Sequence, residues 1–315
     1  MKVLRSKKSI PAEFITTHLK TNGDVKLIYV PGIYKGKEDH DMIMKFPGKK
    51  LKAVTLSYDD GVRDDIRLVE TMAKYGLRGT FNLNSGIFSK KSGERRLTAD
   101  EAADLYEKNG MEIAAHGLFH RFPTQLDSNL CTYEMLKDRE NLEALTGGII
   151  RGFAYAYGNY NDDVVRVLGD CGYAYARTTV STEKFDIPMD WLRMPATCHH
   201  RNPRLPELVN EFLKSDVDIP DWRKKPSLFY LWGHSYEFSD NNNWEIIERF
   251  GDTVGGRDDV WYATNIEIYD YVTAYRRLHY SCDAKTVMNP TSATIHLYEN
   301  GEDYTVHPGE TIKIK

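Results

Sequence analysis

The feature that most constrains the fold is a regular alternation of short apolar runs with longer amphipathic segments after about residue 50. The run KAVTLSY at 52–58 is typical of a buried strand, and the segment at 63–76 carries apolar residues at helical spacing and ends in glycine. Strands that alternate with helices indicate a parallel sheet with helices packed outside it.

The same pattern recurs to about residue 278. We predict further strands at 79–84, 111–116, 149–156, 173–176, near 191–194, at 227–234 and at 260–265, and helices at 98–110, 131–145, 162–170, 205–214 and 266–278. Thr98 and Glu101 have the spacing of a capping box at the start of one helix. Roughly seven or eight such units favour an α/β fold, a distorted (β/α) barrel of about seven parallel strands, over an open sheet.

The two ends of the chain differ from this middle region. Residues 1–50 are rich in lysine and hold the strand-like runs VKLIYVPG and DMIMKFPG, so we expect an N-terminal extension with short strands. The barrel is expected at residues 51–284. Residues 285–315 alternate apolar and polar residues around Asn300-Gly301, which predicts a small C-terminal β-hairpin appendage.

The composition argues against several classes of protein. Lys+Arg is 42 against Asp+Glu 46, and no basic stretch resembles a nucleic-acid footprint. No apolar run approaches the roughly 18 residues of a membrane helix, and no apolar segment follows the basic start as it would in a leader. The four cysteines (Cys131, Cys171, Cys198, Cys282) are scattered, which is typical of free thiols. We therefore expect a cytoplasmic protein without nucleic-acid or membrane partners, and the sequence indicates no oligomeric state.

Chemically reactive side chains follow three of the predicted strands. Asp59 and Asp60 come after the first strand, His116 and His120 follow the third, and His234 ends the strand at 227–234. Because reactive residues of parallel α/β folds cluster at the carboxyl ends of the strands, we expect these side chains at one rim of the barrel.

His116 and His120 have the spacing of a metal-binding pair. On one helical turn, side chains four residues apart lie on the same face, and one carboxylate of Asp59-Asp60 would complete a set of three ligands with a position open for water. Such ligands suit zinc, with cobalt, nickel and iron as alternatives. The second aspartate could then act as a base. Each motif alone also fits a structural role, and only their combination favours a catalytic site.

The segments TLSYDDG, HGLFH, RGFAYAYG and LWGHSYEF, in this order, resemble the polysaccharide deacetylase family, also called the NodB-homology domain or carbohydrate esterase family 4. The resemblance covers roughly residues 50–280. It implies a distorted (β/α) barrel and a metal-dependent hydrolase that removes N- or O-acetyl groups from sugars. By the family pattern, Asp59 would be the general base, and Asp60, His116 and His120 would be the metal ligands.

The later motifs imply further roles but match the family less closely. Tyr157 matches the tyrosine whose backbone N–H helps to hold the oxyanion, and His234 matches the histidine that protonates the leaving group. The family usually has arginine and proline before this Tyr-Gly, whereas Ala154 and Ala156 stand here. Arg151 is the nearest arginine, and it either pairs with the base or forms a structural ion pair.

Three further residues are candidates for substrate binding. The fourth family motif is loosely echoed by Asp190-Trp191, so Trp191 either walls the acetyl pocket or belongs to the core. Tyr236 and Glu237, next to the last histidine, either contact substrate or pack the loop. The run TCHH at 197–200 offers extra ligands, but we expect spare surface histidines because the three-ligand set is already full.

These observations lead to three hypotheses. The first is a metal-dependent hydrolase that removes acetyl groups from an N-acetylated sugar, oligosaccharide or polysaccharide. The second is an amide hydrolase of the same fold that acts on a small cyclic ureide or imide. The third is a carbohydrate-binding protein that has lost activity, and the presence of the complete base and ligand set argues against it.

Overall fold

The computed structural model of the protein describes residues 42–220 and 223–315. The predicted strand VKLIYVPG, at 25–32, lies outside the described residues. The second predicted run forms the short strand β1 (Ile43–Lys45), which ends before a 3-10 turn at Pro47–Lys49. None of the helices in the described residues is long and apolar enough to cross a membrane.

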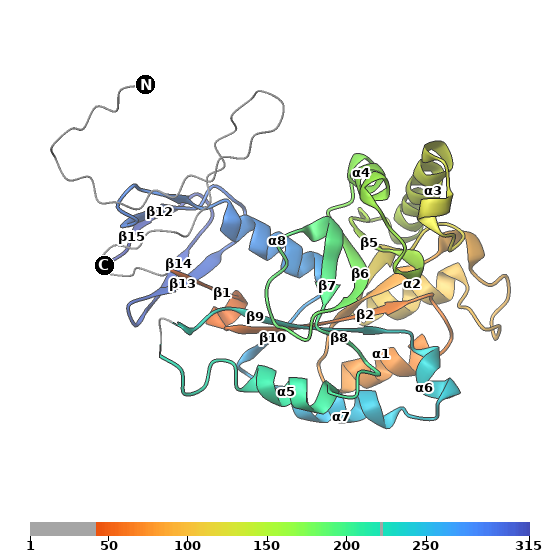
Figure 1. Ribbon diagram of the computed structural model, residues 1–315, viewed down its shortest axis with the longest axis horizontal. Coiled ribbons are helices and arrows are strands. Elements are labelled where there is room, and N and C mark those ends of the chain that lie inside the picture. The colour runs from red at the N-terminus through yellow and green to blue at the C-terminus, as the bar shows by residue number, and fades with distance from the viewer. Residues whose placement is uncertain (1–41, 221–222) are drawn as a thin grey trace, which may run out of the picture. The chain divides into compact units, whose positions relative to one another are not determined.

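A parallel sheet forms the centre of the described residues (Figure 1). Its nine strands are β2 (Lys52–Asp59), β3 (Gly79–Leu83), β4 (Glu112–Ala115), β5 (Gly152–Ala154), β6 (Tyr175–Ser181), β7 (Met194–Ala196), β8 (Cys198–His199), β9 (Ser227–Gly233) and β10 (Val260–Tyr262). The order across the sheet is β7-β6-β5-β4-β3-β2-β9-β8, and β10 pairs with the first half of β2.

One short segment closes this sheet into a barrel. Only Thr197 separates β7 from β8, yet β7 pairs with β6 and β8 pairs with β9, at the opposite edge. The Thr197 amide also donates to Tyr230 O at 2.9 Å. Since β7 and β8 are two pieces of one segment and β10 lies off the path, the barrel has seven positions, and the predicted distorted barrel of about seven parallel strands is confirmed.

Helices alternate with the strands and cover the outside of the barrel. They are α1 (Asp65–Lys74), α2 (Ala99–Lys108), α3 (Ser128–Thr146), α4 (Asp162–Asp170), α5 (Leu205–Leu213), α6 (Tyr236–Asp240), α7 (Glu245–Val254) and α8 (Asn265–Arg276). The outer helices contact one another in the order α5, α7, α1, α2, α3, α4. The capping box predicted for α2 is present, because the Thr98 and Glu101 side chains each accept from the other's backbone N–H. Short 3-10 turns lie at Ser85–Ile87, Pro123–Gln125, Ala156–Gly158 and Trp191–Arg193.

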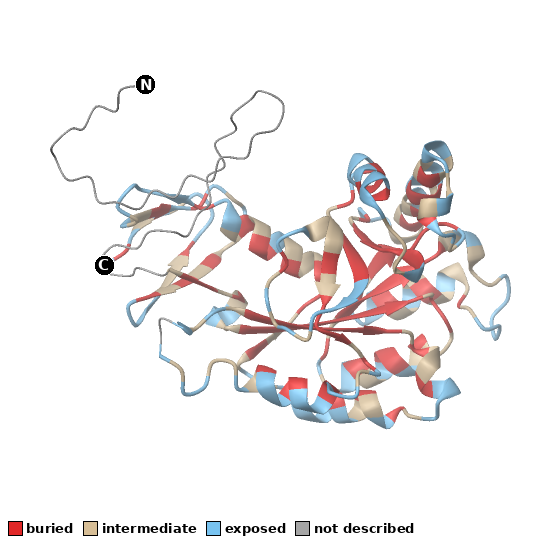
Figure 2. Cartoon of the chain, in the orientation of Figure 1, coloured by how far each residue is buried: buried red, intermediate tan, exposed pale blue. Residues whose placement is uncertain are grey.

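Strand β2 shows how side chains are divided between the two faces of the barrel. All eight of its residues are buried (Figure 2). Val54 and Leu56 belong to the apolar layer beneath the outer helices. The alternate residues Thr55 and Asp59 contact residues of elements that do not neighbour β2 in the sheet. Successive residues of a strand point to opposite faces, so this second set lines the barrel interior.

Helix α8 closes the amino-terminal end of the barrel. Its first residue, Asn265, accepts a hydrogen bond from Thr55 at 2.9 Å and donates to the Tyr230 hydroxyl at 2.7 Å. The Asn265 backbone N–H also donates to the hydroxyl of Thr80, near the start of β3. The opposite, carboxyl-terminal end of the strands is the end at which the predicted reactive residues lie.

The predicted C-terminal hairpin is confirmed as β13 (Ile295–Glu299) and β14 (Glu302–Val306). Asn300 and Gly301 form its turn with φ of 51° and 86°, as a two-residue turn with positive φ requires. Strand β1 pairs antiparallel with β13, so residues from both ends of the barrel sequence form one three-stranded sheet. A second small sheet contains β11 (His279–Tyr280), β12 (Thr286–Met288) and β15 (Thr311–Lys313).

Candidate metal and catalytic site

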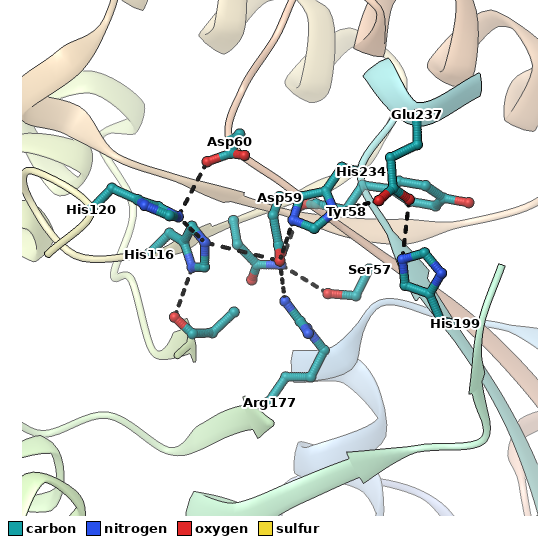
Figure 3. Close-up of polar contacts among 12 residues, drawn as sticks. Ser57, Tyr58, Asp59, Asp60, His116, His120, Arg177, His199, His234 and Glu237 are labelled. Atoms are coloured by element: carbon teal, nitrogen blue, oxygen red, sulfur yellow. Dashed lines mark hydrogen bonds and ion pairs between the residues drawn. The ribbon is translucent and has the colours of Figure 1, made fainter. Parts of the chain in front are cut away.

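The carboxyl ends of three strands bring the predicted reactive side chains together (Figure 3). Asp59 is the last residue of β2, and Asp60 follows it. His116 directly follows β4, and His234 directly follows β9. His120 reaches the same place from the loop after β4, and its ring centroid lies 4.8 Å from that of His116.

Asp60, His116 and His120 form a set of side chains with the spacing of a metal site. The Nε2 atoms of the two histidines are 3.2 Å apart, and His120 Nε2 is 3.5 Å from Asp60 Oδ1. Two nitrogens bound tetrahedrally to zinc at about 2.0–2.1 Å would be about 3.3 Å apart, so the observed spacing fits. His116 Nδ1 lies 2.8 Å from Ala154 O and donates to it, which leaves the lone pair of Nε2 facing the other ligands.

The local structure around His116 and His120 differs from the prediction. We predicted that one helical turn would place both imidazoles on the same side, and this is wrong: residues 117–120 form a turn after β4. Gly117 has φ of 85° and His120 has φ of 54°, so the chain reverses instead of continuing as a helix. The four-residue spacing therefore brings the rings together through a turn.

Three residues of the site have left-handed backbone conformations. They are Asp60, with φ of 84°, His120, with φ of 54°, and Tyr157, with φ of 58°. Such a conformation costs roughly 1–3 kcal/mol for a residue with a side chain and persists only where the surroundings enforce it. Arg96 helps to hold Asp60 in this conformation, because it donates to the backbone O of Asp60 and also lies 3.3 Å from its Oδ1.

Asp59 is a buried carboxylate that forms an ion pair with a buried arginine. Its side chain is about 4% exposed, Oδ1 accepts from Asn82 Nδ2 at 2.8 Å, and Oδ2 accepts from Arg177. His116 and His234 face the same Oδ2 atom with their Nε2 atoms at 3.9 and 3.8 Å. Burial by itself would raise the pKa of Asp59, but Arg177, His116 and His234 hold the pKa well below its usual range. Asp59 is therefore ionised at neutral pH.

The partner of Asp59 is Arg177, and of the two alternatives for Arg151 the structural ion pair is the one present. Arg151 precedes β5, so it lies at the amino-terminal end of the barrel, where its guanidinium pairs with Asp270 of α8 at 2.6 and 2.8 Å. Arg177 lies inside β6, is fully buried, and also packs over the Trp232 ring at 4.5 Å. The available signal was an arginine directly after the apolar run YAYA, because a buried charge in a strand requires a partner.

His234 lies between the base and a second carboxylate. Its Nε2 faces Asp59 at 3.8 Å, and its Nδ1 lies 3.6 Å from Glu237 Oε1. Burial lowers the pKa of His234, but Glu237, Asp59 and Asp60 outweigh this effect, so that the pKa is raised. Glu237 had been predicted to contact substrate or pack a loop, and in the structure it contacts histidines.

The expectation that 197–200 holds spare surface histidines is wrong for His200. This side chain is 1% exposed, and its Nε2 lies 2.9 Å from Glu237 Oε2. Its pKa is lowered to about 4, chiefly by burial. His199 is partly exposed and lies 3.1 Å from the same oxygen. Both residues belong to the segment that closes the barrel, and a local sequence pattern cannot show that this segment is enclosed.

The three remaining aromatic candidates occupy different places. Tyr157 is 56% exposed and stacks on Phe122 with ring centroids 3.9 Å apart, while the edge of its ring contacts His120. Tyr236 lies 5.2 Å from the His234 ring and beneath Arg95. Both tyrosines therefore flank the predicted site.

Trp191 instead packs against α8, where its ring contacts Tyr269 at 5.2 Å and Arg276 at 5.6 Å. Because it precedes β7, it lies at the amino-terminal end of the barrel, and the alternative that it belongs to the core fits this placement. Its neighbour Asp190 accepts from the backbone of Leu192 and pairs with Arg193.

Fold and site together define a (β/α) barrel of the NodB type with a candidate metal centre at the carboxyl ends of its strands. A family model described as Polysaccharide deacetylase matches residues 47–176. The resemblance inferred from the motifs, to the polysaccharide deacetylase family, is thus confirmed. The matched range includes Asp59, Asp60, His116 and His120 but ends before Arg177 and His234.

Solved structures are similar to this chain at low sequence identity. A Mycobacterium smegmatis protein provisionally assigned as a polysaccharide deacetylase is 17% identical, with a TM-score of 0.54, over 74% of this chain and 94% of that one. A Streptococcus pyogenes deacetylase in complex with acetate is 23% identical, with a TM-score of 0.38, and the match covers 40% of this chain and 55% of that one. A CE4 family pseudoenzyme from Bacillus anthracis is 19% identical, with a TM-score of 0.45, over 72% of this chain and 68% of that one. No curated protein matches this chain.

Proposed function

We propose that this protein is a metal-dependent hydrolase that removes acetyl groups from an N-acetylated sugar, oligosaccharide or polysaccharide. The observation that carries the proposal is the adjacency of two groups: three side chains whose ligand atoms all lie within 4.8 Å of one another, and a buried, ionised carboxylate beside them. Asp60, His116 and His120 would hold the ion, which we expect to be zinc, with cobalt, nickel or iron as alternatives. When bound, such an ion supplies a water of lowered pKa and polarises the acetyl carbonyl.

Asp59 is the proposed general base. Arg177 keeps it ionised and, together with Asn82, fixes the direction of its carboxylate. An ionised carboxylate at the site can accept the proton of the attacking water, a contribution worth roughly 10²- to 10⁴-fold in rate. Its neighbour Asp60 would be engaged by the ion.

His234 is the proposed acid. Its raised pKa favours the imidazolium, and Nε2 faces the base, so a substrate placed between the ion and His234 would meet a proton donor at its leaving nitrogen. An amine leaves poorly unless it is protonated. The Tyr157 backbone N–H is the proposed oxyanion donor, and the left-handed conformation of Tyr157 sets its direction.

Exposed aromatic rings beside the site favour a carbohydrate substrate. Tyr157, Phe122 and Phe119 are 56%, 40% and 41% exposed, and Tyr157 and Phe122 stack face to face. Exposed aromatic side chains of this kind pack well against the apolar faces of sugar rings. We propose Tyr236 as a further substrate contact, because it flanks His234 at the site.

The test is a release assay on metal-stripped and metal-restored protein. The substrates are N-acetylglucosamine oligomers, an O-acetylated sugar and small cyclic ureides and imides. We expect acetate release from the N-acetylated sugars only after the metal is restored. Hydrolysis of the cyclic amides without acetate release would favour the second hypothesis. Binding of the sugars by metal-loaded protein without any turnover would favour the binding protein.

A further inference from the structure

A cluster beyond the proposed ligand set surrounds Glu237, and we call Glu237, His199, His200 and His234 the Glu237 cluster. Figure 3 shows Glu237 with His199 and His234. Glu237 Oε2 lies 3.1 Å from His199 Nε2 and 2.9 Å from His200 Nε2. Its other oxygen, Oε1, lies 3.6 Å from His234 Nδ1. All four residues lie outside the range matched by the family model.

Two imidazoles and a carboxylate are typical metal ligands, but one contact argues against a second metal here. The Arg201 backbone N–H donates to His199 Nδ1 at 3.1 Å. In the neutral ring the proton then lies on Nε2, which faces Glu237, and a nitrogen that carries a proton cannot ligate a metal. Glu237 therefore faces an N–H group of His199 and does not share a metal ion with it.

Aromatic rings and a glycine enclose the His200 ring. It follows β8 in the segment that closes the barrel, and its backbone N–H donates to Trp232 O at 2.8 Å. Its ring stacks between Tyr58 and Phe238, with centroid distances of 5.8 and 4.2 Å. A Cβ atom at Gly233 would clash with the ring, so only glycine at that position leaves room for it.

The contacts within the cluster are close but not aligned as hydrogen bonds. His200 Nε2, His234 Nδ1 and Glu237 Oε2 are buried atoms without a hydrogen-bond partner of good geometry among the described residues. Catalytic hydrogen bonds are often loose in the absence of substrate and tighten in the complex. Since buried polar atoms without partners are costly, the arrangement favours a small rotation that aligns these groups. Arg201 Nη1 lies 3.9 Å from Oε1 and adds a positive charge beside Glu237.

We infer that His199 and His200 are positioning residues that act on His234 through Glu237. They hold one carboxylate oxygen, so that the other turns toward His234 Nδ1 and sets the ring with Nε2 toward Asp59. The inference rests on the proposed function, because it assigns His234 the acid role. It adds that the segment closing the barrel also orients the acid.

The test uses two substitutions at His200. His200→Phe keeps a ring between Tyr58 and Phe238 but removes the donor, and His200→Gln keeps a donor near the position of Nε2. We expect His200→Phe to lower kcat for an N-acetylglucosamine oligomer roughly tenfold, about the value of one hydrogen bond to a charged group, with little change in KM. Cleavage of 4-nitrophenyl acetate, whose leaving group needs no proton, should change much less. His200→Gln should restore most of the lost rate, and His279→Phe, at an exposed histidine, is the control.

Two further measurements keep the inference separate from the proposed function. A crystal structure of the His200→Phe variant should show that the Glu237 carboxylate has turned away from His234, and this readout requires no activity. The inference fails if Glu237 and His234 keep their orientation in that structure, or if both substrates lose rate equally. Elemental analysis that finds two metal ions in each wild-type chain would also overturn it. Absence of acetate release by the wild type would refute the proposed function alone.

Discussion

Replacement of Arg177 by methionine tests the electrostatics of the site most sharply. The pair of Arg177 and Asp59 is enclosed, with side chains 0% and 4% exposed, so solvent screens it little. Removal of one partner of a buried ion pair costs roughly 3–5 kcal/mol, because the other charge remains buried without compensation. The free energy of unfolding of Arg177→Met should fall by about this amount at pH 7.5.

Arg151→Met is the matched control, because Arg151 and Asp270 also form an ion pair, but their side chains are 37% and 50% exposed. A surface pair of this kind is worth about 0–1 kcal/mol. The double variant Asp59→Asn/Arg177→Met removes the stranded charge, so it should be more stable than Arg177→Met alone. Metal-stripped protein is used throughout, so that no bound ion compensates Asp59.

The pKa of Asp59 determines whether the free energy of unfolding rises or falls with pH. In the wild type this pKa lies below the value of about 3.9 in the unfolded chain, so the stability from the pair is present above about pH 4 and is lost as the pH falls. In Arg177→Met, loss of the guanidinium raises the folded pKa of Asp59, and protonation at lower pH relieves the unpaired charge. The stability deficit should therefore be larger at pH 7.5 than at pH 5.

Urea denaturation at both pH values measures these quantities. The reasoning is refuted if Arg177→Met loses no more stability than Arg151→Met. It is also refuted if the deficit does not depend on pH, or if the additional Asp59→Asn substitution fails to recover stability.

Three further predictions concern the base, the acid and the amino-terminal end of the barrel. Asp59→Asn should bind metal as the wild type does but lose roughly 10²- to 10⁴-fold in turnover, and a smaller loss in steady-state kinetics would reject its role as base. His234→Ala should slow amide cleavage more than cleavage of an activated acetate ester, whereas equal losses would count against the acid role. Burial raises the pKa of Glu112 to about 7, so this carboxyl binds more protons in the folded than in the unfolded chain between about pH 4.5 and 7, and its contribution to wild-type stability should fall as the pH rises through this window. In urea denaturation at pH 5.5 and 8.5, Glu112→Gln should reduce this fall in stability. An unchanged pH dependence of the free energy of unfolding would contradict the raised pKa of Glu112.

The sequence predicted the barrel well because its strands and helices have strong local signals. Strand β2 is a continuous buried run, and α2 begins at a true capping box. The rule that reactive residues follow parallel strands then placed the two aspartates and three histidines at one end. The same rule explains why Arg151 and Trp191 do not reach the site, because both residues precede their strands and lie at the other end of the barrel.

The features that the sequence analysis missed depend on contacts between distant residues. The predicted strand at 173–176 stopped directly before Arg177, and no local pattern shows that this arginine crosses the barrel to Asp59. Closure depends on the short strands β7 and β8, which carry little periodicity. The burial of His200 follows from that closure. The pairing of β1 with β13 joins segments about 250 residues apart.

The central claim is that one divalent ion is held by Asp60, His116 and His120. The direct measurement is a zinc titration of metal-stripped protein, followed by elemental analysis after removal of free metal. We expect one ion for each wild-type chain and for His279→Ala, a control at an exposed histidine. We expect none for His120→Ala. In the wild type, acetate release should return in proportion to the amount of bound metal. Retention of one ion by His120→Ala, or no ion bound by the wild type, would contradict the claim.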